Sequence, residues 1–108
     1  MNEQTIQEGK TLAIVSYLTF VGLIISIVLN LEKKNPFTFF HIRQMLGLVI
    51  MLIFSNLVEK YVNSWLGTAF WFITFLSWLY GFYWSLKGKV KLIPFLGTLF
   101  QDWFKNIK

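Results

Sequence analysis

Three side chains that can exchange protons or bind charged groups lie close together in an otherwise apolar stretch: His41, Arg43 and Gln44. Histidine serves as an acid, a base or a metal ligand, and arginine binds carboxylates and phosphates. On a helix, His41 and Gln44 share one face, whereas Arg43 shares another face with Gly47. Two interpretations stay open. The cluster is either a buried, hydrogen-bonded histidine beside an arginine that reaches lipid headgroups, or a site that touches a substrate, a headgroup or a partner.

The rest of the sequence gives this cluster little catalytic support. The chain has one His and no Cys, so it lacks a thiolate nucleophile and the ligand spacing of a metal site. An ion-coupled transporter normally keeps a carboxylate inside the membrane. Here the five acidic residues all lie outside the apolar stretches: Glu3, Glu8, Glu32, Glu59 and Asp102. We therefore predict no enzymatic activity, no catalytic residue, no metal and no cofactor.

The composition points to lipid as the solvent of this chain. Hydrophobic residues make up 56% of the 108 residues and charged residues 14%, against about 25% charged residues in soluble domains. Apolar stretches cover residues 12–31, 36–58 and 65–86, and about 20 helical residues cross a hydrocarbon core. Asn35 as N-cap and Pro36 at the first helical position mark the start of the second stretch. We predict an all-α polytopic membrane protein, one domain over residues 1–108 with three transmembrane helices.

A fourth helix is predicted over residues 92–107. Apolar residues recur there at helical spacing, with Thr98, Gln101, Asp102 and Lys105 on the opposite face. The segment is too short and too polar on one side to cross a bilayer. We expect an amphipathic helix in the headgroup plane, or one whose apolar face caps the helix bundle.

Small and polar residues form narrow strips on two of the predicted spans. Gly22, Ser26 and Asn30 recur every fourth residue in the first span, and the third span carries Ser77, Gly81 and Ser85. Small residues let neighbouring helices approach closely. We expect both strips to pack against other helices. Antiparallel packing would also bring Asn30, and with it Ser85, to the level of His41 and Gln44, as a polar knot at the cytoplasmic mouth of the bundle.

The basic residues predict the orientation. With three spans, Lys10 and Lys60 lie on one side of the membrane and the other eight of the ten Lys and Arg residues lie on the opposite side. The positive-inside rule then places the N-terminus outside and the C-terminus in the cytoplasm. Nothing near Met1 resembles a secretory signal, so we expect the N-terminal segment to be retained. The predicted location is the bacterial cytoplasmic membrane.

The run Phe40-His41-Ile42-Arg43-Gln44-Met45-Leu46-Gly47 resembles a motif that opens a membrane helix in a known family. That family comprises the small bacterial relatives of the twenty-kilodalton component of the Tic protein-import translocon of the chloroplast inner envelope. The stretch from Lys10 to Leu18, Gly88-Lys89 and Ile93-Pro94-Phe95-Leu96-Gly97 are similar as well. The plant member has four spans and is associated with protein translocation, whereas only three are counted here. The resemblance implies motif positions at His41, Arg43, Gln44 and Gly47, without an assigned role.

These observations predict a non-enzymatic integral membrane protein that acts as an interaction or accessory subunit of a membrane complex. Its expected partners are the lipid bilayer and other membrane-protein subunits or further copies of itself. The basic residues flank apolar segments, which favours headgroups over nucleic acid, and no small-molecule substrate is evident. Two alternatives stay open: a holin-like oligomeric pore former, and a membrane immunity or stress protein.

Overall fold

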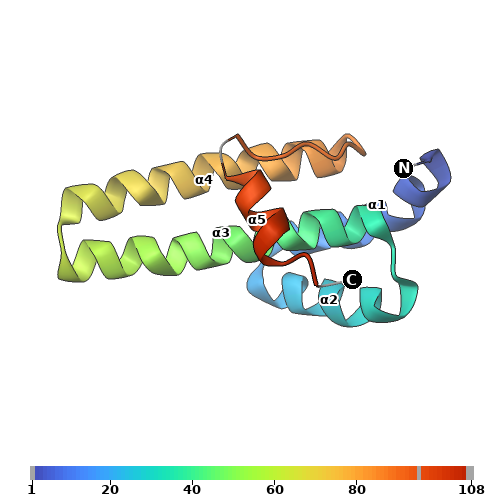
Figure 1. The fold of residues 1–108 in the computed structure, drawn as a ribbon, viewed down its shortest axis with the longest axis horizontal. Helices are drawn as coiled ribbons and strands as arrows, with labels where there is room; N and C mark the ends of the chain where they lie inside the picture. The colour runs from blue at the N-terminus through green and yellow to red at the C-terminus, as the bar shows by residue number, and fades with distance from the viewer. Residues whose placement is uncertain (1, 95, 107–108) are drawn as a thin grey trace.

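The computed structural model describes residues 2–94 and 96–106, and these residues form five helices (Figure 1). They are α1 (Glu3–Leu18), α2 (Phe20–Lys33), α3 (Pro36–Tyr61), α4 (Ser64–Leu86) and α5 (Gly97–Trp103). The predicted all-α class is confirmed. The molecule is elongated, with principal extents of 46 × 23 × 23 Å.

α3 and α4 form a long antiparallel hairpin that runs the length of the molecule (Figure 1). Both begin at an asparagine cap, because Asn35 accepts from the backbone N–H groups of Phe37 and Thr38, and Asn63 accepts from those of Trp65 and Leu66. The Asn35–Pro36 start is as the sequence predicts. These two helices are long and apolar enough to cross a membrane. Only 17% of the apolar window of α4 is buried inside the molecule, unlike the core helix of a soluble domain.

The predicted first span over residues 12–31 is wrong as a single helix. α1 ends at Leu18, Thr19 is extended (φ −155°, ψ 172°), and α2 begins at Phe20. The chain reverses there, so that α1 and α2 pack against each other as a hairpin beside the first half of α3 (Figure 1).

Small residues explain why the chain can fold back. Ser26 Oγ donates to the Leu12 carbonyl at 2.7 Å, and a side chain at Gly22 would collide with the Val15 carbonyl. The Thr19 hydroxyl accepts from the Gly22 N–H at 3.0 Å, which caps α2 at the reversal. We expected the strip with Gly22 and Ser26 to pack against another span. It instead packs α2 against α1, the two halves of the predicted first span.

The predicted C-terminal helix over residues 92–107 is also shorter than expected. In the described residues α5 covers seven residues, Gly97–Trp103, while Leu92 and Ile93 precede it as loop; Ile107 lies outside the described residues. α5 lies across α3 near the middle of the molecule (Figure 1). Ile93 and Phe100 are buried, at 2% and 1% exposure. We expected this segment either to lie in the headgroup plane or to cap the bundle with its apolar face. Ile93 and Phe100 follow the second expectation, because they are buried against the bundle.

The core fills one half of the molecule. Its buried residues are Tyr17, Leu23, Phe39, Ile42, Met45, Leu48, Ile93 and Phe100. Beyond the tip of the α1–α2 hairpin, α3 and α4 continue as a bare pair with exposed Phe54, Leu57, Phe72 and Leu76. Contiguous apolar surface of this kind indicates contact with lipid or with another protein.

Candidate functional site

His41 lies in the interior of the helix bundle and has a hydrogen-bond partner on each ring nitrogen. Nδ1 lies 2.7 Å from the Tyr17 hydroxyl, and Nε2 lies 3.0 Å from the Lys89 carbonyl. A carbonyl only accepts, so Nε2 carries the proton in the neutral imidazole and Nδ1 accepts from the tyrosine. His41 therefore connects α1 to the segment that follows α4.

Gln44 extends this connection on the same face of α3. Its Nε2 donates to the Tyr17 hydroxyl at 3.4 Å, and its Oε1 accepts from the backbone N–H of Ile93 at 2.9 Å. The Tyr17 hydroxyl thus accepts from Gln44 and donates to His41. Among the described residues, no buried side-chain nitrogen or oxygen lacks a partner.

Arg43 and Gly47 contact α5 from the neighbouring face of α3. Arg43 Nη1 donates to Gln101 Oε1 at 2.8 Å, and Gln101 Nε2 donates in turn to the Phe40 carbonyl at 2.9 Å. The ring of Phe100 lies where a Cβ of residue 47 would stand. Only glycine admits this contact.

All four motif positions therefore hold the C-terminal segment. His41 binds the backbone at Lys89, Gln44 binds the backbone at Ile93, and Arg43 and Gly47 receive α5. We refer to residues 89–94 and 96–103 as the C-terminal strap. Each ring nitrogen of His41 is occupied by the chain itself, an arrangement that fastens segments together.

The predicted polar knot has different members from those expected. Asn30 does not bond to His41; its side chain donates to the Asn35 carbonyl and accepts from the Asn35 N–H, both at 3.1 Å. It therefore closes the α2–α3 loop. Ser85 donates to Phe82 O at 2.7 Å, within its own helix. Tyr17 of α1 takes the place beside His41 that we expected for Asn30, because residues 12–31 fold back at Thr19 and do not form one straight helix.

The predicted helix-packing residues also serve the chain's own fold. Gly22 and Ser26 form the α1–α2 contact described above. Gly81 lies against the ring of Tyr17, so α4 approaches α1 closely there. Ser77 and Ser85 are buried as well, at 8% and 0% exposure.

Sequence reasoning missed Tyr17 and Trp78. Tyr17 is fully buried, and its hydroxyl is the centre of the network. Trp78 Nε1 donates to the Tyr17 carbonyl at 2.7 Å, which satisfies an end carbonyl of α1 that the break at Thr19 leaves without a helical partner. The sequence signal for Tyr17 was a polar hydroxyl next to Ser16 within an apolar stretch. Trp78 could not be distinguished by sequence from the many other aromatic residues of α4.

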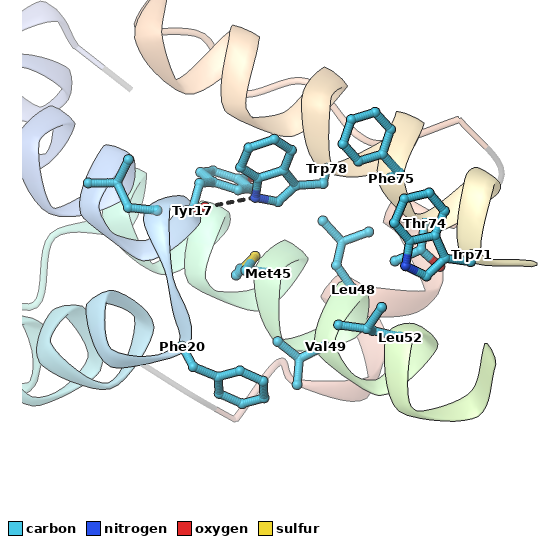
Figure 2. A pocket seen from close by; sticks show the side chains of 11 residues that line it. Tyr17, Phe20, Met45, Leu48, Val49, Leu52, Trp71, Thr74, Phe75 and Trp78 are labelled. Carbon is cyan, nitrogen blue, oxygen red and sulfur yellow. Dashed lines mark hydrogen bonds between the residues drawn. The ribbon is translucent and has the colours of Figure 1, made fainter. Parts of the chain in front are cut away.

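An apolar cavity of about 300 Å³ lies at the tip of the α1–α2 hairpin. Figure 2 shows Tyr17 and Phe20 on the left, Met45 and Leu48 toward the centre, and Trp71 of α4 on the right. Few polar atoms line the cavity. The hydroxyl of Thr74, which is one of its lining residues, donates to the Phe70 carbonyl of the same helix. Such a lining suits an acyl chain or another apolar group and provides no acid–base pair. Among the described residues, no cluster of three His, Cys, Asp or Glu exists that could hold a metal.

Comparison with known proteins adds no further constraint on this arrangement. No protein-family model, curated protein or solved structure matches the chain. The geometry and chemistry of the described residues are therefore what supports a function.

Proposed function

We propose that the chain is a non-enzymatic integral protein of the bacterial cytoplasmic membrane, acting as an interaction or accessory subunit of a membrane complex. One observation carries the proposal: His41 and Gln44 of the motif point inward and hold the chain's own strap, whereas α3 and α4 present apolar side chains outward. Lipid or an apolar partner is the environment that such a surface requires.

In this proposal α3 and α4 cross the membrane, and the α1–α2 hairpin enters it from one side without crossing. α2 has 14 residues, and apolar stretches of 10–14 residues are typical of re-entrant or buried segments. Two backbone groups at the Thr19 break have side-chain partners: the Tyr17 carbonyl accepts from Trp78, and the Gly22 N–H donates to Thr19. Such partners are what backbone at membrane depth needs. This arrangement takes the place of the three spans expected from hydropathy.

The proposal keeps the resemblance to the bacterial Tic-component relatives. In that family context, the motif at His41, Arg43, Gln44 and Gly47 has a structural role, because it fixes the strap against the membrane helices. The partner-binding surface is then elsewhere, on the bare half of the α3–α4 hairpin with Phe72 and Leu76. A second copy of the chain or another membrane subunit would cover it.

Fractionation followed by co-purification tests this function. The protein should stay in the membrane pellet through alkaline carbonate extraction and leave it with mild detergent. Cross-linking in intact membranes before solubilisation should then yield a defined membrane partner or a homo-oligomer. Phe72→Ala with Leu76→Ala should lose that product, whereas Val21→Ala with Val28→Ala, on the exposed face of α2, should keep it. A stable monomer in detergent-free buffer would contradict the proposal.

The holin-like alternative rests on the same exposed helix pair and differs in its outcome. An oligomeric pore depolarises cells when the protein is overexpressed, whereas an accessory subunit leaves the membrane potential unchanged. A potential-sensitive dye distinguishes the two. If the chain is a membrane immunity or stress protein, overexpression should leave the membrane potential normal. Cells that lack the protein should then show a defect only when they are exposed to a bacteriocin or to stress.

A further inference from the structure

A second hollow, of about 400 Å³, lies beside the N-terminal end of α3 and is lined by Lys34, Pro36, Phe39 and Arg43. We propose that it binds an anionic membrane phospholipid, with the lipid phosphate between Lys34 and Arg43. The inference rests on the membrane location proposed above. Lys34 takes no part in the strap contacts or in the apolar cavity, whereas Arg43 also donates to Gln101 of the strap.

Both cations line the same hollow, one from each side of the α2–α3 loop. Lys34 is the C-cap of α2, and Arg43 lies seven residues beyond Pro36, or roughly 10 Å along the axis of α3. Arginine offers a planar fork of donors to phosphate, and lysine adds a mobile point charge. Basic pockets of this kind on the cytoplasmic side bind anionic headgroups.

Gln101 fixes the guanidinium in place. Arg43 Nη1 donates to Gln101 Oε1, and Gln101 is itself anchored to the Phe40 carbonyl. Arg43 is partly buried beside apolar Phe39. A cation held in position before the ligand arrives loses less side-chain freedom on binding than a mobile one.

The backbone at Lys34 ends α2. Its φ is +51°, in the left-handed region that glycine adopts without strain, and its N–H donates to the Asn30 carbonyl as the C-cap of the helix. At helix ends this position is usually glycine. The backbone therefore accepts a Lys34→Gly substitution.

The apolar surface next to the cations favours a lipid over free phosphate. Phe39 and Pro36 line the hollow. Leu46 and Ile50 follow Phe39 and Arg43 at helical spacing, so they continue the same face of α3 toward the membrane centre. Ile50 is 44% exposed. An acyl chain bound by its phosphate at the hollow would lie along these residues.

Native mass spectrometry of the protein purified in an uncharged detergent tests the site. The probes are phosphatidylglycerol and phosphatidylcholine with identical acyl chains, and inorganic phosphate as a third arm. Lys34→Gln is compared with Lys33→Gln, because both remove one positive charge from neighbouring exposed positions and only Lys34 lines the hollow. Lys34→Gly serves as a second variant, since glycine relieves the left-handed backbone and keeps the fold.

Wild type should bind phosphatidylglycerol in preference to phosphatidylcholine. Both Lys34 variants should weaken phosphatidylglycerol binding about fivefold, as expected for one lysine at a membrane surface, and Lys33→Gln should change it less than about twofold. Equal losses in the Lys33 and Lys34 variants would overturn the site. Inorganic phosphate that displaces the lipid would overturn the lipid assignment. A protein that needs detergent but shows no lipid preference would contradict this inference and leave its membrane location standing.

Discussion

The Tyr17 hydroxyl is where three parts of the chain meet. It donates to His41 and accepts from Gln44, and these two side chains hold the backbone at Lys89 and Ile93. In low dielectric surroundings a complete network of this kind rigidifies the structure, and a missing member leaves a costly unpaired group. The network thus makes the position of the strap depend on α1.

Tyr17→Phe tests this dependence. The variant keeps the ring and leaves His41 Nδ1 without its donor in a fully buried place. We expect a loss of about 1–3 kcal/mol in the free energy of unfolding, measured by denaturant titration in detergent micelles. Tyr83→Phe, at a half-exposed position on α4, is the matched control and should change the value by less than about 0.5 kcal/mol. Equal effects would show that the hydroxyl of Tyr17 has no special role.

Gly47 and Phe100 form a pair whose coupling has a predictable sign. Gly47→Ala alone should destabilise the protein by about 1–3 kcal/mol, because the new methyl group overlaps the Phe100 ring. In a Phe100→Ala background the overlap is gone, and alanine is a better helix former than glycine by about 1 kcal/mol. The same Gly47→Ala change should then be neutral or stabilising. Unfolding of the four proteins of this double-mutant cycle measures the coupling.

Local residue patterns were predictable and distant partners were not. Asn35 and Pro36 mark the start of α3 because capping depends on neighbours within a few residues. The shared face of His41 and Gln44 followed from their spacing. Their partners lie 24 residues away at Tyr17 and 49 residues away at Ile93. Spacing carries no information on such pairs. Asn30 was placed wrongly although its partner, Asn35, is close in sequence, because residues 12–31 had been assigned to one straight span.

At the scale of elements, one break decides the architecture. A hydropathy average over a window depends only on composition. Residues 12–31 are apolar enough for a membrane span by this measure, whether they form one helix or two. Folding back at Thr19 requires α1 and α2 to approach closely, which Gly22 and Ser26 permit. It also requires a donor for the Tyr17 carbonyl, which Trp78 of α4 supplies. α3 and α4 contain no such break, so their extents were predicted to within a few residues. Tertiary contacts thus settled what composition left open.

A distance measurement tests the α1–α2 hairpin directly. The chain has no Cys, so spin labels can be placed at Gln7→Cys and Glu32→Cys, both exposed. Helices packed side by side have axes about 8–10 Å apart, and the labels should lie within about 20 Å. A straight helix would separate the two positions by about 38 Å.

Gly22→Val should lengthen and broaden that distance, because its side chain meets the Val15 carbonyl. Val21→Leu, at an exposed neighbouring position, is the control and should leave the distribution unchanged. A wild-type distance near the longer value would restore the single helix.

At the scale of the whole molecule, the proposed two-span arrangement predicts a different orientation, with the N-terminus in the cytoplasm instead of outside. With α3 and α4 as the two spans, α1 and the strap lie on the same side. Among the described residues, Lys60 is then the one basic residue near the α3–α4 loop, while Lys33, Lys34, Lys87 and Lys89 lie at the opposite end. The charge asymmetry is larger than in the three-span arrangement, because Lys10 joins the basic side. The positive-inside rule therefore favours this topology more strongly.

Labelling of single cysteines in intact cells decides between the two topologies. We expect an impermeant maleimide to label Val62→Cys, in the exposed α3–α4 loop, and to reach Gln7→Cys and Asn106→Cys only after the membrane is permeabilised. Three spans would instead leave Gln7→Cys and Val62→Cys both labelled from outside. Asn106→Cys is cytoplasmic in either topology and serves as the internal control for membrane integrity. Labelling of Gln7→Cys in intact cells, with Asn106→Cys protected, would mean that residues 12–31 cross the membrane after all.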